Sequence, residues 1–177
     1  KERYLVKARH WMSQKGRKED AKVLEEQVQL LKIQTDLERE TGKPEYLGLS
    51  VSETIYQAFL DGQPKKAGKI HKDFGVPNKR FWWLKIKALA AMGEWDALEK
   101  FSKEKSPIGY KPFFDTCMKE SNMMHALKYI PRITDTAERV EAMCRCGKFQ
   151  EAIEDAFKDK NPDLLSAIAG QTNDQLH

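Results

Sequence analysis

Cysteines and long apolar runs are scarce in this 177-residue sequence. The longest uncharged apolar stretches, such as Phe81 to Leu84, are far shorter than the roughly 20 residues that a membrane-spanning helix requires. The three cysteines form an odd number, and Cys144 and Cys146 would point to opposite faces of a helix. We therefore expect a soluble protein in a reducing compartment, with no disulfide framework and no metal site.

Recognisable catalytic signatures are missing as well. The sequence contains no phosphate-binding glycine loop, its histidines lack the spacing of metal ligands, and no carboxylate pair stands out from the charged background. The sequence therefore predicts no catalytic residue and no cofactor. We expect the chain not to be an enzyme.

The residues that are abundant favour helices. Valine and isoleucine are sparse relative to alanine, leucine, lysine and glutamate, and this balance disfavours sheet. Charged residues make up 33% of the chain and hydrophobic residues 40%, which fits thin helical layers with much exposed surface. The length is compatible with one structural unit over residues 1–177.

Apolar periodicity and stop signals place the expected helices. They cover residues 1–12, 18–40, 52–60, 64–74, 79–92, 94–105, 112–120, 123–130, 134–146, 149–158 and 163–170. The 18–40 segment carries one apolar stripe through Val28 and another through Val23 and Leu37, which predicts burial on two faces. Because the connections are short, neighbouring helices should be antiparallel.

A turn pattern recurs along the chain. Gly62, Gly93, Asn122 and Gly147 each stand at a predicted helix stop, and an alanine follows four or five residues later. Glycine and asparagine tolerate a left-handed cap, and alanine allows the returning helix to approach closely. The pattern predicts an all-α fold, an α-solenoid of antiparallel helical hairpins without a sheet. Because the first helix starts at Lys1, we expect a fragment of a longer protein.

Positive charge is concentrated in one segment. Residues 63–87 hold eight basic residues against one acidic residue, a net charge of +7, whereas the whole chain carries +4. Such a run is often only a solvated face, but here Arg80, Trp83 and Lys87 share one helical face. Phe81 and Leu84 lie on another face, so we assign them to the core together with Trp82. The candidate partner-binding residues are Arg80, Lys79, Trp83, Lys87, Lys69 and Lys72.

An acidic protein partner is one of three ligands that this basic surface could accept. The first alternative is direct binding of anionic membrane lipid, and the second is RNA. We do not expect nucleic acid, because 27 acidic residues nearly match 31 basic ones and tryptophans in mid-helix favour packing over base stacking.

Three ordered motifs resemble one known family. They are Val76-Pro-Asn-Lys-Arg-Phe-Trp-Trp-Leu-Lys85, Trp95-Asp-Ala-Leu-Glu-Lys-Phe-Ser-Lys103 and Ser106-Pro-Ile-Gly-Tyr-Lys-Pro-Phe113. Together they resemble the C-terminal region of the vacuolar protein sorting-associated protein 16 family. The resemblance is close over residues 49–159 and looser over residues 1–46.

The resemblance implies an α-solenoid subunit of the HOPS and CORVET tethering complexes, which bring late endosomal, lysosomal or vacuolar membranes together for SNARE-mediated fusion. It implies docking of an SM-class SNARE chaperone, vacuolar protein sorting-associated protein 33, on residues 1–92, with residues 93–177 as further hairpins. The family's basic docking residue falls on Arg80. Other complex subunits would be contacted directly and SNAREs indirectly, at a cytoplasmic location peripheral to the membrane.

Overall fold

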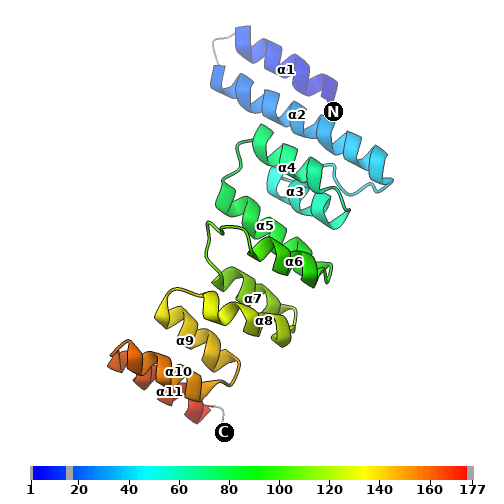
Figure 1. Ribbon diagram of the computed structural model, residues 1–177. Helices are drawn as coiled ribbons and strands as arrows, with labels where there is room; N and C mark the ends of the chain where they lie inside the picture. Colours follow the sequence, from blue (N-terminus) through cyan, green and yellow to red (C-terminus); the bar gives the residue numbers. More distant parts are fainter. Residues whose placement is uncertain (1, 15–17, 175–177) are drawn as a thin grey trace. The chain divides into compact units, whose positions relative to one another are not determined.

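The computed structural model describes residues 2–14 and 18–174, and over these ranges it contains helices and no strand (Figure 1). The all-α class is therefore confirmed. The helices are α1 (Glu2–Gln14), α2 (Lys18–Thr41), α3 (Val51–Leu60), α4 (Pro64–Asp73), α5 (Asn78–Ala91), α6 (Trp95–Ser102), α7 (Lys111–Lys119), α8 (Met123–Tyr129), the short 3-10 helix η1 (Ile130–Arg132), α9 (Thr136–Arg145), α10 (Phe149–Lys158) and α11 (Pro162–Asp174). Contacts divide the chain into unit 1, Lys1–Ala88, and unit 2, Leu89–His177.

Unit 1 is built from helices that pack as sequential neighbours. Helix α1 packs on α2, and α3 packs on α4. The core side chains come from α2, the 42–50 connection, α3, α4 and α5, and they include Leu37, Ile55 and Ile70. Phe81 and Leu84 pack against this cluster, which confirms their assignment to the core.

Helix α2 is buried on two faces over only part of its length. Val28 and Leu37 are buried, but Val23 is 54% exposed, so the prediction of a second continuous buried stripe is wrong at Val23. Helix length gives the reason. Helix α2 has 24 residues and α3 has 10, so the α3–α4 hairpin can cover less than half of α2.

Unit 2 repeats the pairing of neighbours, with α7 on α8, α9 on α10 and α10 on α11. Small residues at the contact between α9 and α10 let the helices approach, since Ala152 and Ala156 are fully buried. Cys117 and Cys144 are buried core residues, whereas Cys146 is half-buried.

The recurring turns are helix C-caps of one type. Gly62, Gly93 and Gly147 adopt left-handed φ values of 68°, 71° and 71°. At Gly62 the amide donates to Phe59 O, and the following amide donates to Ala58 O, which is the hydrogen-bond pattern of a Schellman motif. The predicted left-handed caps are therefore confirmed at the three glycines.

The fourth turn of the pattern differs from the prediction. Asn122 has a φ of −99°, and it is Ser121 that takes the left-handed conformation at 57°. Asn122 instead begins α8, because its side chain accepts a hydrogen bond from His125 N. An asparagine is a good N-cap as well as a tolerable left-handed residue, and here the N-cap role prevails.

Helix length and polarity also bear on membrane insertion. Across the part of the chain that the structure describes, no helix combines the length and the apolar character needed to cross a bilayer.

Candidate partner-binding surface

The N-terminus of α3 is the rigid base of the predicted surface. Ser50 caps the helix, because its Oγ accepts from Glu53 N at 3.3 Å while the Glu53 carboxylate accepts from Ser50 N at 2.8 Å. The hydrogen bond that the Ser50 amide donates to the carboxylate, followed by a smaller contribution from the Ser50 hydroxyl, lowers the pKa of Glu53. Both partners are thereby satisfied, and the first turn of α3 is fixed around Ser52.

Arg80 is anchored to this turn. Its Nε donates to Ser52 Oγ at 2.9 Å, and the two residues are 28 positions apart in the chain. The Arg80 side chain remains exposed, and among the described residues no carboxylate pairs with it. The anchored Nε leaves both Nη groups as donors that can meet a carboxylate in a planar, two-point geometry.

The exposed face of α5 continues from Arg80. Trp83 is 39% exposed and Lys87 is exposed, while the residues that precede them, Trp82 and Ile86, are buried at 7% and 0%. The predicted face through Arg80, Trp83 and Lys87 is therefore at the surface, and we call these three residues the α5 stripe. The assignment of Trp82 to the core is confirmed.

Aromatic contacts fix the opposite side of α5. The Phe81 ring stacks on His71 of α4 with centroids 4.2 Å apart and meets Phe59 of α3 at 5.5 Å. Because Phe81 is adjacent to Arg80, this packing holds the rotation of α5 about its axis. The stripe is thus presented by a helix that cannot turn without disrupting the core.

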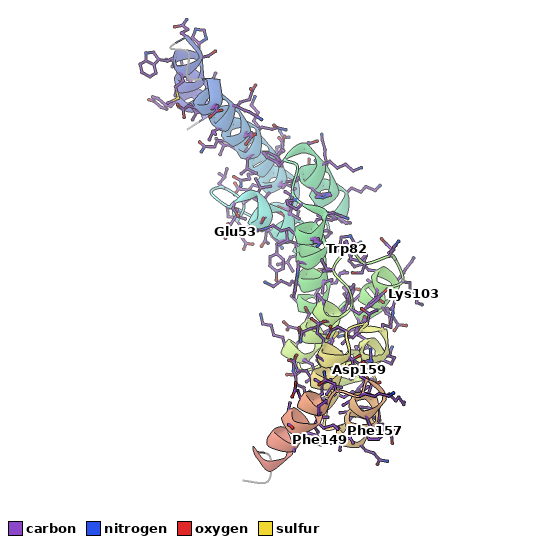
Figure 2. All side chains as sticks on the ribbon, turned by 90° about the vertical axis from the view of Figure 1, so that its left-hand side faces the viewer. Glu53, Trp82, Lys103, Phe149, Phe157 and Asp159 are labelled. Carbon is purple, nitrogen blue, oxygen red and sulfur yellow. The ribbon has the colours of Figure 1, made fainter. Side chains whose placement is uncertain are left out.

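The structure does not bring all six predicted residues together. Lys79 is exposed next to Arg80 in the first turn of α5, but Lys69 and Lys72 are exposed on α4. In Figure 2, α3, on which Glu53 is labelled, lies on one side of unit 1 and α4 lies on the other. Lys69 lines a groove against α2, and no residue of α5 lines that groove.

Ser52 is the contributor that sequence reasoning missed. Ser52 does not cap α3, because Ser50 fills that role. Nothing in local periodicity links Ser52 to Arg80, because their contact depends on how α3 and α5 pack.

The chemistry available on this surface is charge and directed hydrogen bonding around one exposed indole. Among the described residues, no group of histidine, cysteine, aspartate and glutamate could hold a metal ion. The arrangement of Arg and Trp on a fixed helix is typical of residues that dominate protein–protein interfaces.

Comparison with known proteins supplies the family. The family model described as Vps16, C-terminal region, matches residues 2–175. A vacuolar protein sorting-associated protein 16 homolog of Dictyostelium discoideum is 44% identical over 94% of this chain and 20% of the relative. Protein VACUOLELESS1 of Arabidopsis thaliana is 42% identical over 84% of this chain, and the Saccharomyces cerevisiae vacuolar protein sorting-associated protein 16 is 29% identical over 70%.

These matches cover most of this chain but a small part of each relative. The chain spans 20% of the Dictyostelium protein, 18% of the Arabidopsis protein and 16% of the Saccharomyces protein. The family that the three sequence motifs predicted is confirmed over nearly the whole length of the chain. The chain belongs to the Vps16 C-terminal region family.

Proposed function

We propose that this chain is an α-solenoid scaffold region of a membrane-tethering subunit that acts in vacuolar protein sorting. The support is family membership and the vacuolar sorting role in the names of its relatives. The complex in this proposal is HOPS or CORVET, held as a peripheral component on the cytoplasmic side of late endosomes and lysosomes or vacuoles. Other subunits of the complex bind the chain directly.

The docked partner in this proposal is an SM-class SNARE chaperone, vacuolar protein sorting-associated protein 33. It binds within residues 1–92, and residues 93–177 extend the scaffold. The chain itself breaks no bond and needs no cofactor. It holds the SM protein at the tether, so that SNAREs engage the complex through that partner.

The observation that carries this proposal is the anchored, exposed guanidinium of Arg80. A free arginine side chain loses rotamer freedom on binding, but the 2.9 Å bond to Ser52 has already restricted Arg80. The neighbouring indole of Trp83 offers apolar area beside this charge. A carboxylate on the partner, next to a pocket for an indole edge, would match both groups.

The lysines contribute differently from Arg80. Lys87 belongs to the α5 stripe and Lys79 lies next to Arg80, and both add positive charge at the rim of the interface. Lys69 and Lys72 lie on α4, so in this proposal they attract an acidic partner over a distance without touching it. Charges of that kind mainly raise the association rate, and salt screens them.

The test is the affinity of the 177-residue chain for the purified SM partner, measured by calorimetry and by co-elution in size exclusion. Arg80→Glu should abolish co-elution, because reversing a charge in a buried interface costs about 2–5 kcal/mol. Its circular dichroism spectrum should match the wild type, since Arg80 is exposed and outside the core. Wild-type affinity of this variant would refute the assignment.

Three further variants separate the roles. Ser52→Ala should weaken binding modestly, by about 0.5–1.5 kcal/mol, because it removes only the hydrogen bond that positions Arg80. Lys69→Glu should slow association and leave dissociation unchanged. Lys119→Glu reverses an exposed lysine of α7 in unit 2 and is the matched control, for which we expect wild-type affinity and rates.

A further inference from the structure

A groove lies between α2 and α4 of unit 1. Its volume is about 340 Å³, and no residue of the α5 stripe lines it. The residues that line it are Ile33, Asp36 and Leu37 of α2 and Lys65, Lys66, Lys69 and Ile70 of α4.

The floor of the groove is aliphatic and rigid. Leu37 is 0% and Ile70 is 1% exposed, and both belong to the core of unit 1, while Ile33 is half-buried and packs against that core. Side chains held in a packed core keep their positions when a ligand enters. The groove is therefore preformed, and it is apolar where an apolar group would enter.

The rim carries uncompensated positive charge. The acidic neighbours on α2 are already paired, Glu40 with Lys66 at 2.8 Å and Asp36 with Arg39 at 2.8 Å. Lys65 and Lys69 are exposed, and within the described ranges neither has an acidic partner.

The spacing of these two lysines adds a reason for a ligand. They stand one helical turn apart on α4, where like charges repel each other. A carboxylate placed between Lys65 and Lys69 would relieve this repulsion and gain two attractive contacts.

We infer that the α2–α4 groove binds an acidic amphipathic segment of a partner protein, whose apolar side chains enter the groove while its carboxylates meet Lys65 and Lys69. Helix α4 is short, and its buried residues Ala67 and Ile70 belong to the core of unit 1, so a ligand can reach apolar side chains of α2 and α4 together in the groove. This site is separate from the α5 stripe and does not depend on the SM partner. It gives unit 1 a second docking position.

The same surface fits a bilayer or RNA less well. Membrane binding needs apolar side chains that protrude, and α4 has no exposed large hydrophobic residue. Single-stranded RNA binds by stacking on aromatic rings, whereas Ile33, Leu37 and Ile70 are aliphatic. A concave aliphatic floor with a basic rim matches a protein segment.

The test uses the 177-residue chain and a fluorescein-labelled helical peptide of alanine and glutamate that carries two leucines one turn apart. Fluorescence anisotropy should show saturable binding that weakens as salt is raised. Methyl NMR should show shifts at Ile33 and Ile70. Lys65→Glu combined with Lys69→Glu should weaken binding by about tenfold or more, because it replaces attraction by repulsion at both contacts.

Two matched controls decide whether the groove is the site. Lys72→Glu combined with Lys79→Glu makes the same change of charge in unit 1 outside the lining of the groove, so it should reduce affinity by no more than about twofold. A peptide with both leucines replaced by alanine should lose most of the binding. Equal weakening by both double variants, or equal binding of both peptides, would overturn the proposal in favour of general charge attraction.

Flotation with vesicles of phosphatidylcholine and phosphatidylserine tests the membrane alternative. If the wild type binds these vesicles at all, the proposal expects both double variants to weaken that binding equally. Lys65→Glu combined with Lys69→Glu should then bind vesicles no more weakly than Lys72→Glu combined with Lys79→Glu. Vesicle binding lost selectively in the groove variant, without saturable peptide binding by the wild type, would overturn the inference and assign the groove to anionic lipid.

Discussion

The buried amide of Gln34 is the polar connection that we expect to matter most for unit 1. Gln34 is 2% exposed on α2, and its Nε2 donates to Leu49 O at 2.8 Å and to Thr54 Oγ1 at 2.9 Å. Its Oε1 accepts from Gly48 N at 3.3 Å. One side chain thus ties α2 to the 42–50 connection and to the first turn of α3, the turn that also holds Ser52.

Gln34→Ala should destabilise unit 1 by about 2–4 kcal/mol, since a buried polar group left without its partner costs about 1–3 kcal/mol. The two groups that count are Leu49 O, which is partly buried, and Thr54 Oγ1, on a residue that is 0% exposed. Gly48 is exposed, so water can replace the bond to its amide. Thr54 Oγ1 also keeps its own bond to Ser50 O, which places the estimate below the sum of two full penalties.

Gln34→Met separates hydrogen bonding from packing. Methionine fills nearly the same volume as glutamine but donates no hydrogen bond. If Gln34 stabilises unit 1 through its hydrogen bonds, Gln34→Met should therefore lose almost as much stability as Gln34→Ala. If Gln34 stabilises unit 1 mainly through packing, Gln34→Met should lose less than about 1.5 kcal/mol of stability, as volume-conserving exchanges in cores do.

The assay is urea unfolding combined with amide hydrogen exchange read by mass spectrometry. Exchange in residues 42–60 should accelerate in both variants, while exchange in α9 and α10 of unit 2 provides the internal reference. Wild-type stability of Gln34→Met would refute the reasoning, because it would mean that the three hydrogen bonds contribute nothing net.

Two further predictions concern titratable groups. Burial alone would raise the pKa of Asp61, but the hydrogen bonds that its carboxylate accepts, including one from Tyr46 OH at 2.7 Å, outweigh burial and lower the pKa. The Asp61 carboxylate therefore stabilises the fold fully above its unfolded pKa of about 3.9, and this stabilisation is lost as the pH falls through the lower folded pKa. Asp61→Asn should therefore have a lower urea midpoint than the wild type at pH 7, and the difference between the two midpoints should be smaller at pH 3. An equal difference at pH 7 and pH 3 would contradict this prediction. Burial raises the pKa of all three thiols, that of Cys117 to about 11, so exposure decides which thiol reacts first. Cys146 is half-buried whereas Cys117 and Cys144 are buried, so Cys146 should react with a disulfide reagent faster than the other two in the native chain, and Cys146→Ser should remove that phase. Rapid reaction of Cys117 in that variant would show that the α7 core opens.

Local signals explain why the helices could be predicted so closely. A Schellman turn such as that at Gly62 is completed within six residues, so its glycine and its apolar neighbours are all visible in a short stretch of sequence. The same locality explains the error at Asn122. Two capping roles compete within two positions there, and only the backbone shows that Ser121 takes the left-handed one.

The site could be predicted only where it is helical. The spacing of Arg80, Trp83 and Lys87 defines one face of α5 without any knowledge of its neighbours. The bond from Arg80 to Ser52 and the groove between α2 and α4 depend instead on contacts between helices, which leave no periodic trace.

The charge count along the sequence treated two surfaces as one basic patch, whereas in the fold they are separate: the α5 stripe and the α2–α4 groove. The run of eight basic residues in segment 63–87 spans α4 and α5, and the connection between these helices turns their lysines and arginine toward different neighbours. Arg80 faces the N-terminus of α3, whereas Lys65 and Lys69 face α2. At long range an acidic partner is attracted to one basic region. At contact distance that region consists of two different sites, a fixed guanidinium beside an indole and an aliphatic groove with a basic rim. Faster dissociation of the SM partner from Arg80→Glu and loss of peptide binding from Lys65→Glu with Lys69→Glu therefore report on different interfaces, which are connected only by the long-range attraction of an acidic partner and its salt dependence.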